Sequence, residues 1–568
     1  WNGASPVRSR FAPLGGCWRV LGRSPLPRVI RQETKDMGMQ RRTFLATTLA
    51  APLAAPLARP ALAQASRART LRFMPQAALA NLDPIFSPST IITTHGYCVF
   101  DTLYGMDAQF RPQPQMAAGH SIDDGGRSVT ITLRPGLKFH DGEPVRAQDV
   151  VPSLQRWMRR NPFGQKLATV TDDIQVVDDM RLRFRLKKPF PLLFHALAQV
   201  SNSPAFIMPE RLAKTDPFQQ VREAVGSGPF RFKANEFNSG SLVVFERFAD
   251  YVPVQTGTTS LTAGPKIAHF DRVEWHIIVD AATAAAALQT GEIDWYEQPP
   301  PEVQQLLRRN RQVSIEAIDP LPLTGILRFN HLHGPFNNKA LRQALLPAIS
   351  QQDFMQASVG TDASLYTTGV GCFTPGTPLA NDAGLAPLMG PRSIDRAKQL
   401  MREAGYTNQP MRLIGPTDIL VPAALTQVGA DLVRRLGFNA DIVLSDWGTT
   451  VQRRTSRKPL ERGGWSMLFT SFSSFDFADP AAHFPLRGNG NNAWFGWPDV
   501  PKLEELRDAW FDAPDLPAQQ ALAREMQTVA MDELPYIPLG SYKSMTALRA
   551  NLTGRVAGLA LYWGIRRS

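Results

Sequence analysis

Segments with two different hydrophobic periodicities alternate along most of this chain, and that alternation limits its fold most strongly. Apolar residues recur at every second position, as in half-buried β-strands, over 70–74, 128–133, 181–187, 241–245 and 274–279. They recur every three to four positions, as on one face of an α-helix, over 149–158, 281–290, 338–349, 393–404 and 517–534. Because strands and helices interleave without one regular βαβ series, we expect an α/β protein with several lobes.

The net charge of +12 does not indicate nucleic-acid binding, because most of it lies in one segment. Residues 1–65 contain ten Lys and Arg, against only Glu33 and Asp36. The basic excess in the rest of the chain is small and scattered, without a basic stripe. With 568 residues, 43% of them hydrophobic, the chain is long enough for two or more lobes with sizeable cores.

Residues 39–65 have the layout of a cleaved export signal. After Met39, the Arg-Arg-Thr-Phe-Leu stretch at 41–45 resembles the core of a twin-arginine signal, and 63–65 form a small-x-small cleavage site. An N-terminal membrane anchor is the alternative, but prolines and an arginine interrupt the apolar run. We therefore expect 1–65 to be an upstream extension plus a signal cleaved near residue 65, and the mature protein to be periplasmic.

The three cysteines, Cys17, Cys98 and Cys372, lack the spacing of a metal site. Cys98 and Cys372 could pair in an oxidising compartment, and the sequence leaves that question open. No later segment has about 18 uninterrupted apolar residues, so we expect no membrane-spanning helix.

A secreted hydrolase is the main alternative class, and the usual motifs for it are missing. The chain contains no GxSxG, HExxH or SxxK sequence. His331 and His333 could share a strand face, but no third metal ligand is evident beside them. We therefore expect neither an enzyme nor a metal site.

Nine short motifs follow one another through the mature chain. They are residues 81–84, 99–104, 133–150, 226–230, 288–294, 329–330, 335–345, 479–480 and 534–539. The block 133–150, Leu-Arg-Pro-Gly-Leu-Lys-Phe-His-Asp-Gly-Glu-Pro-Val-Arg-Ala-Gln-Asp-Val, is the most specific. In this order the motifs resemble the family 5 extracellular solute-binding proteins of ABC importers, the dipeptide- and oligopeptide-binding group.

Each motif also has a structural interpretation. Arg134-Pro135-Gly136 and Asp141-Gly142 are turn sequences that precede a helix. The Gly-Ser-Gly-Pro sequence at 226–229 lacks the Lys-Ser/Thr of a phosphate-binding loop, so we expect a crossover turn there. Gly291 is expected to end a helix.

The resemblance implies a two-lobed periplasmic-binding-protein fold, hinged and type II-like, with an extra small domain. We expect the lobes to alternate along the chain. The first lobe is expected at 66–110, 226–325 and 535–568, the small domain at 111–225, and the second lobe at 326–534.

The resemblance also implies a function without covalent chemistry. A peptide or peptide-like small solute would bind between the lobes, and an ABC permease with its ATPase would receive it. Family relatives that bind sugars, nickel chelates, haem or opines are the alternatives. We expect a monomer that needs no cofactor.

Asp476 is the main candidate for contact with a ligand. It occupies the position at which, by resemblance, peptide-binding members carry the carboxylate for the ligand's α-amino group. The structural alternative is an aspartate that caps a helix or stabilises a loop. Ser473 departs from the family pattern, which often has a tryptophan there, and this suggests a reshaped pocket.

Further candidates are aromatic or polar side chains. Tyr97 on the first lobe and Trp447, Phe472 and Trp494 on the second could line a cleft, or could simply pack in the cores. Arg328 and Asn330, on a strand that crosses between the lobes, could meet a ligand carboxylate or carbonyl; a salt bridge at the hinge is the alternative.

Overall fold

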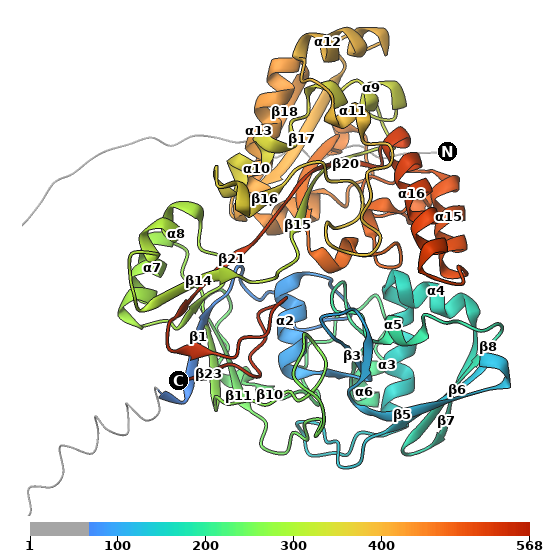
Figure 1. Ribbon diagram of the computed structural model, residues 1–568, viewed down its shortest axis with the longest axis vertical. Helices are drawn as coiled ribbons and strands as arrows, with labels where there is room; N and C mark the ends of the chain where they lie inside the picture. Colours follow the sequence, from blue (N-terminus) through green and yellow to red (C-terminus); the bar gives the residue numbers. More distant parts are fainter. Residues whose placement is uncertain (1–67) are drawn as a thin grey trace, which may run out of the picture. The chain divides into compact units, whose positions relative to one another are not determined.

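A computed structural model describes residues 68–568 (Figure 1). The expected leader and its cleavage site lie outside the described residues. Three sheets of four or more strands organise the rest of the chain. We call the seven-stranded and four-stranded sheets with their helices the first lobe, and the six-stranded sheet with its helices the second lobe.

The seven-stranded sheet has the strand order β10-β11-β12-β1-β13-β21-β14. Its strands are β1 (Thr70–Met74), β10 (Phe230–Phe232), β11 (Leu242–Arg247), β12 (Arg272–His276), β13 (Trp295–Tyr296), β14 (Val313–Ala317) and β21 (Met545–Arg549). The central β1 pairs in parallel with β12 and β13, whereas the outer strands pair antiparallel. The parallel strands therefore end at one edge of the sheet.

The six-stranded sheet has the order β16-β20-β15-β19-β17-β18. Its strands are β15 (Leu323–Phe329), β16 (Tyr366–Thr367), β17 (Pro410–Pro416), β18 (Asn439–Ser445), β19 (Met467–Phe472) and β20 (Tyr536–Tyr542). β17 runs parallel to β18 and β19, so the last residues of these strands share one edge. Two chain connections join this sheet to the seven-stranded one, from β14 to β15 and from β20 to β21.

The third sheet is antiparallel, in the order β5-β6-β8-β7. Its strands are β5 (Ala117–Asp123), β6 (Ser128–Leu133), β7 (Thr171–Asp178) and β8 (Arg181–Leu186), and α3 (Ala147–Arg160) packs against β7 and β8. In β8 buried and exposed residues alternate strictly, so one face packs on the protein and the other faces solvent.

The other helices and strands connect or cover these sheets. In the first lobe they are α2 (Thr90–Val99), β2 (Asp101–Thr102), β3 (Tyr104–Met106), β4 (Pro112–Pro114), α4 (Pro162–Val170), α5 (Leu193–Leu197), β9 (Phe206–Ile207), α6 (Glu210–Ala213), α7 (Ala281–Thr290), α8 (Pro301–Leu307), β22 (Leu552–Thr553) and β23 (Arg566–Arg567). In the second lobe they are α9 (Lys339–Gln343), α10 (Gln351–Val359), α11 (Ala386–Met389), α12 (Ile394–Glu403), α13 (Leu420–Leu436), α14 (Trp447–Arg453), α15 (Pro501–Phe511) and α16 (Leu516–Glu533).

The predicted elements are mostly found, and their differences have local causes. β1, β6 and α7 have the predicted bounds, and Gly291 ends α7 in the left-handed conformation. The helix expected over 338–349 is wrong as one element: α9 ends at Gln343, and a 3-10 turn contains Pro347. Proline cannot continue the helix because it lacks an N–H and its ring clashes with the preceding turn.

The Gly-Ser-Gly-Pro loop has a structural reason for its glycines. A Cβ on Gly226 would lie 2.1 Å from the carbonyl oxygen of Val99, and one on Gly228 would lie 2.6 Å from that of Cys98. Side chains would therefore prevent the loop from packing on the end of α2. The loop acts as the crossover turn expected from the sequence.

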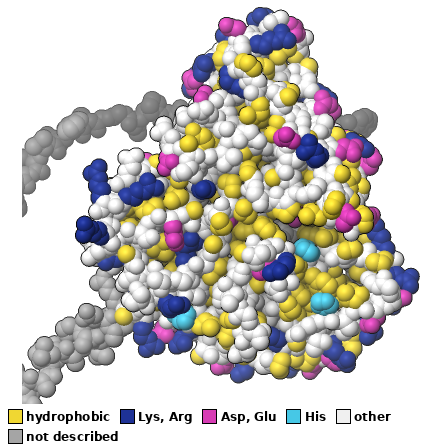
Figure 2. Space-filling view, viewed as in Figure 1, with side chains coloured by type: hydrophobic (Ala, Val, Ile, Leu, Met, Phe, Trp, Pro, Cys, Tyr) yellow, Lys and Arg dark blue, Asp and Glu magenta, His cyan; other side chains and the backbone are white. Residues whose placement is uncertain are grey.

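Cys98 and Cys372 are both buried, and they do not form a disulfide with each other in this structure. No helix of the described residues is long and apolar enough to cross a membrane. The expected domain boundaries stay predictions, except that β20 lies in the six-stranded sheet although 535–568 were expected in the first lobe. On the face in Figure 2, basic and acidic side chains are intermixed, and hydrophobic side chains gather in a hollow.

Candidate ligand-binding site

Asp476 lies at a contact between the two lobes. It belongs to a 3-10 helix, Ser474–Phe477, which begins just beyond the end of β19. Its carboxylate accepts hydrogen bonds from the Ser201 hydroxyl of the first lobe at 2.6 Å and from the Ser473 amide at 3.0 Å. Only 7% of Asp476 is exposed, and this burial raises the pKa of its carboxyl group.

No cation of the described chain compensates Asp476. Its hydrogen-bond partners are both neutral, and no Lys, Arg or His among residues 68–568 forms an ion pair with it. A buried carboxylate with two neutral donors retains accepting capacity for a cationic group. The Ser473 bond is also the capping contact of the 3-10 helix Ser474–Phe477, so Asp476 has the capping role that was the structural alternative. Its contact with a ligand stays a prediction.

The segment that carries Ser201 follows α5, and hydrogen bonds to neighbouring residues fix its position. The Tyr97 hydroxyl donates to the carbonyl oxygen of Val200 at 2.9 Å, and the Asn202 amide donates across the lobes to Ala482 at 3.1 Å. In the same segment, Gln199 is 8% exposed, and neither the oxygen nor the nitrogen of its buried side-chain amide is hydrogen-bonded within the described residues. Such a group costs free energy until a ligand or water satisfies it.

Tyr97 therefore supports the site and does not face it. Its side chain is fully buried and its ring packs edge-on against Phe206 and Trp563, at centroid distances of 5.0 and 6.1 Å. The core-packing interpretation is the one that the contacts favour. Its hydroxyl fixes the backbone beside Gln199 and Ser201.

The Asp476 helix is also tied to the connection between the sheets. Ser474 donates from its hydroxyl to Asp319, which lies between β14 and β15, at 2.6 Å. Thr374 donates to the Ser474 carbonyl at 2.9 Å. The β14–β15 connection therefore contacts the short helix that carries Asp476.

Phe472 and Trp494 form an aromatic wall beside this helix. The Phe472 ring stacks on Phe477 at 5.2 Å and meets Trp494 edge-on at 5.4 Å. Phe472 and Trp494 are both half-buried, so part of each ring remains accessible. Trp447, the first residue of α14, is connected to this wall through Arg454, which lies over the rings of Trp447 and Trp494.

Arg328 holds the wall in place. Its guanidinium donates to the carbonyl oxygens of Trp494 at 2.9 Å and Phe495 at 2.6 Å, and also to Pro485 and Pro535. Burial lowers the pKa of Arg328 to about 9. The expected alternative of a hinge salt bridge is wrong, because no carboxylate within residues 68–568 pairs with this arginine.

Asn330 is not joined to Asp476 by any contact of the described residues. Its side-chain oxygen accepts from the Leu332 amide at 3.0 Å, and its buried side-chain nitrogen has no hydrogen-bond partner within residues 68–568. A contact with a ligand carbonyl stays a prediction for Asn330.

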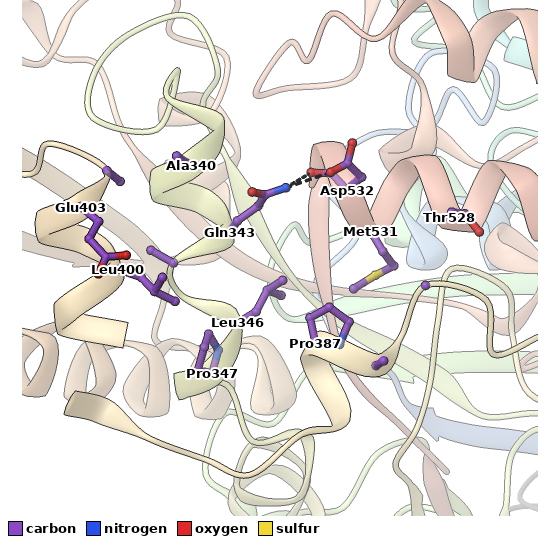
Figure 3. A pocket seen from close by; sticks show the side chains of 14 residues that line it. Ala340, Gln343, Leu346, Pro347, Pro387, Leu400, Glu403, Thr528, Met531 and Asp532 are labelled. Carbon is purple, nitrogen blue, oxygen red and sulfur yellow. Dashed lines mark hydrogen bonds between the residues drawn. The ribbon is translucent and has the colours of Figure 1, made fainter. Parts of the chain in front are cut away.

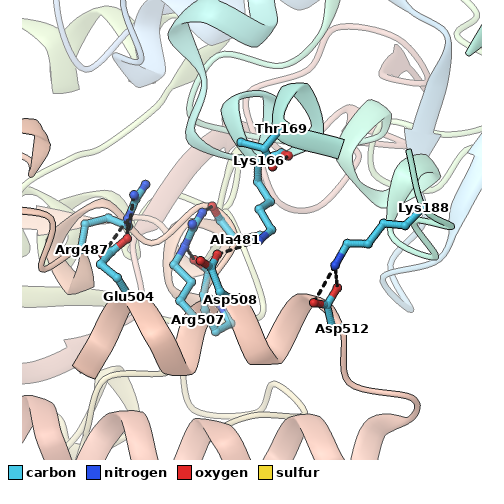
Figure 4. A network of polar contacts seen from close by, with 10 residues as sticks. Lys166, Thr169, Lys188, Ala481, Arg487, Glu504, Arg507, Asp508 and Asp512 are labelled. Atoms are coloured by element: carbon cyan, nitrogen blue, oxygen red, sulfur yellow. Dashed lines mark hydrogen bonds and ion pairs between the residues drawn. The ribbon is translucent and has the colours of Figure 1, made fainter. Parts of the chain in front are cut away.

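Two ion pairs join the lobes at α15 and the residue that follows it (Figure 4). Lys166 on α4 pairs with Asp508 on α15 at 2.6 Å, and Lys188 pairs with Asp512 at 2.7 Å. On the same helix, Arg507 donates to the carbonyl oxygen of Ala481 at 2.9 Å. α15 thus links the inter-lobe ion pairs to the segment that follows Asp476.

Two pockets form elsewhere in the described chain, and neither includes Asp476. One of about 660 Å³ lies within the second lobe between α9, α11, α12 and α16 (Figure 3). There Gln343 donates to the side chain of Asp532 at 3.0 Å. The other, of about 710 Å³, lies in the first lobe beside the β3–β4 turn. No group of three or more potential metal ligands occurs in the part of the chain that the structure describes.

Sequence reasoning missed three residues of this region. Gln199 and Ser201 lie in a loop without a motif, far along the chain from Asp476. Arg454 offered one signal: it follows Trp447 by seven residues, which places both on one side of a helix.

Two α/β lobes joined by two chain connections are the architecture of a two-lobed periplasmic binding protein. Comparisons with a protein-family model and with known relatives identify the chain as a protein of this class. Residues 111–494 match the model of the bacterial extracellular solute-binding proteins, family 5. The chain belongs to this family.

Two curated relatives match over most of both chains. A probable peptide ABC transporter periplasmic-binding protein of Sinorhizobium fredii is 35% identical, covering 86% of this chain and 93% of the relative. A glutathione-binding protein of Pectobacterium atrosepticum is 27% identical, covering 84% and 90%.

Solved structures share the fold. A dipeptide-binding protein of Pseudoalteromonas in complex with Met-Leu has a TM-score of 0.71 and 21% identity, covering 88% of this chain and all of the other. The agropinic acid-binding protein of A. tumefaciens R10 has a TM-score of 0.72 and 17% identity, covering 88% and 99%. The two-lobed periplasmic-binding-protein fold is thus confirmed.

Proposed function

We propose that this protein is the periplasmic binding component of an ABC importer, exported by the twin-arginine route. It binds a peptide or peptide-like solute with a free amino group between its lobes. It then delivers the solute to the permease and its ATPase without covalent change, as a monomer. The observation that carries the proposal is the buried Asp476 carboxylate without a cationic partner among the described residues.

A ligand ammonium would compensate this carboxylate through a charge-assisted hydrogen bond. The relatives support the ligand class, since their names refer to peptide transport and to glutathione, which is a peptide. The agropinic acid complex of a structural neighbour makes an opine the second ligand class to test.

Binding would shift an equilibrium between open and closed lobes. The bonds from Ser201 to Asp476 and from Asn202 to Ala482 require the lobes to be in contact. A ligand that forms hydrogen bonds with Asp476 and Gln199 at the same time would stabilise only the state in which the lobes are in contact. The permease would then recognise the ligand-bound form.

A thermal-shift screen of the purified protein tests the ligand class. Free di- to pentapeptides are compared with sugars, nickel chelates, haem and opines. A true ligand at 100 times its Kd stabilises the protein by about 2.7 kcal/mol. Stabilisation by peptides supports the proposal, whereas stabilisation only by sugars, chelates or haem would overturn the ligand class.

A further inference from the structure

The pocket within the second lobe is separate from the contact between the lobes. It has a volume of about 660 Å³, and α9, α11, α12 and α16 surround it (Figure 3). Neither Asp476 nor the aromatic wall of Phe472 and Trp494 belongs to the described residues that line it. Small-molecule sites typically have volumes of about 300–1,000 Å³, so this pocket has the size of a second ligand site.

Most of the pocket wall is apolar. Ala344, Leu346 and Met531 are at most 4% exposed, and they belong to the core of the second lobe. Pro347 follows Leu346 in the 3-10 turn that interrupts the helix expected over 338–349, so the break in that helix also forms part of the wall. An apolar group that enters the pocket is removed from water, which favours its binding.

The charged side chains that line the pocket are both carboxylates. Glu403 on α12 and Asp532 on α16 lie on opposite sides of it (Figure 3), and no Lys, Arg or His is among its described lining residues. Asp532 pairs with Lys339 at 2.6 Å. Glu403 accepts a hydrogen bond from Gln399 of its own helix at 2.8 Å and forms no ion pair within residues 68–568. Glu403 therefore retains acceptor capacity for a cation, whereas an anionic ligand would be repelled.

The pocket of the first lobe does not share this combination. Its lining contains Arg111 and Arg134 as well as Asp107. Arg111 pairs with Asp107 at 3.0 Å, and Arg134 donates to the carbonyl oxygens of Gln115 and Val252. The charged groups of that pocket thus have partners within the protein.

We propose that the second-lobe pocket binds a small amphipathic amine. The alkyl or aryl group of the ligand packs against Leu346, Leu400 and Met531, and its ammonium group donates a charge-assisted hydrogen bond to Glu403. Asp532 adds negative charge on the opposite side, although Lys339 compensates part of it. The site is independent of the solute between the lobes, so the inference goes beyond the proposed function.

Three probes with the same alkyl chain test the class of ligand: hexylamine, hexan-1-ol and hexanoate. Their dissociation constants for the wild-type protein are measured by saturation-transfer NMR titration. Hexylamine should bind about fivefold more tightly than hexan-1-ol, because an exposed ion pair contributes up to about 1 kcal/mol. Hexanoate should bind more weakly than the alcohol, because both carboxylates repel it.

Glu403→Gln tests the role of the carboxylate. The variant should bind hexylamine and hexan-1-ol equally, with the affinity for the alcohol unchanged. Glu525→Gln is the matched control, because Glu525 is an exposed carboxylate of α16 outside the pocket, and it should keep the preference for the amine. Retention of the full preference by Glu403→Gln would overturn the assignment of Glu403.

Ala340→Trp tests the location of the site. Ala340 is an exposed residue of α9 that lines the pocket, so an indole ring there fills the pocket and leaves the core intact. Hexylamine and hexan-1-ol should no longer bind to this variant. Ala521→Trp, at an exposed position of α16 outside the pocket, is the control and should bind both probes as the wild type does.

Asp476→Asn separates this pocket from the site between the lobes, and it should bind hexylamine as the wild type does. Loss of hexylamine binding in Asp476→Asn, with retention in Ala340→Trp, would place the amine between the lobes and reject the pocket. Equal affinity of the wild-type protein for hexylamine and hexan-1-ol would reject the amine as the ligand class. If the wild-type protein binds neither probe, the site itself is rejected.

Discussion

The Ser201 hydroxyl donates a 2.6 Å hydrogen bond to the Asp476 carboxylate across 275 positions of sequence. The bond joins a loop of the first lobe to the short 3-10 helix that follows β19 in the second lobe. It therefore couples the proposed amine site directly to the contact between the lobes.

Ser201→Ala should weaken ligand binding without abolishing it. A hydrogen bond to a charged group contributes about 1.5–3 kcal/mol, and the Ser473 amide would still bond to Asp476. We expect roughly a tenfold higher Kd, which corresponds to about 1.4 kcal/mol, by calorimetry. Ser121→Ala, on the exposed part of β5, is the control, and an unchanged Kd for Ser201→Ala would show that this bond does not contribute to closure.

Asp476→Asn should stabilise the unliganded protein at neutral pH. Burial raises the pKa of Asp476, so folding favours its protonated form. The wild-type protein therefore loses stability as the pH rises from the unfolded pKa, near 3.9, through the raised folded pKa. The variant lacks this loss, so its Tm should exceed that of the wild type at pH 7, and the two should converge below about pH 4.

Differential scanning fluorimetry across pH measures this difference. Asp441→Asn, which removes an exposed carboxylate that pairs with Arg412, is the control and should show no such gain. A lower Tm of Asp476→Asn at pH 7 would mean that Asp476 is a structural carboxylate.

The two inter-lobe ion pairs should favour the contact between the lobes to a modest and salt-sensitive extent. Lys188 and Asp512 are each about half exposed, with side-chain exposures of 48% and 52%, so their pair contributes at most about 1 kcal/mol. Lys188→Glu should increase the radius of gyration in small-angle scattering, because it places two like charges together. Adding Asp512→Lys should reverse the increase. Identical scattering for all three proteins would show that the pair has no influence on closure.

Arg328→Met should destabilise the fold while removing no ligand contact. The change removes the arginine donor from four carbonyl groups. Two of these contacts are buried, those with Pro485 and Pro535, and losing them costs about 1–3 kcal/mol each if no water replaces the donor. The Trp494 carbonyl still accepts from the Trp497 amide. We expect a loss of at least about 3 kcal/mol in urea unfolding, together with altered fluorescence of Trp494. If stability is unchanged and only ligand affinity falls, Arg328 contacts the ligand directly.

The sequence was most informative where local chemistry decides structure. β1, β6 and α7 were predicted to the residue because short-range periodicity and a terminal glycine define them. The helix over 338–349 was overextended because its hydrophobic period continues past Pro347, where the backbone cannot.

The site was predictable only in part, because its properties depend on partners distant in sequence. Asp476 and the aromatic wall of Phe472 and Trp494 came from motif order and residue type. Ser201 could not be found, since nothing local marks a serine that meets a carboxylate across the lobes. Arg454 lies over the rings of Trp447 and Trp494, and this contact between residues distant in sequence is seen only in three dimensions.

Calorimetry of wild-type protein and Asp476→Asn with one tight-binding peptide, free and N-acetylated, tests the central claim most directly. The wild type should bind the free peptide at least tenfold more tightly than its acetylated form, a difference of about 1.4 kcal/mol or more. Asp476→Asn should lose that preference. Retention of the full preference by the variant would contradict the assignment of Asp476 as the amine-binding carboxylate.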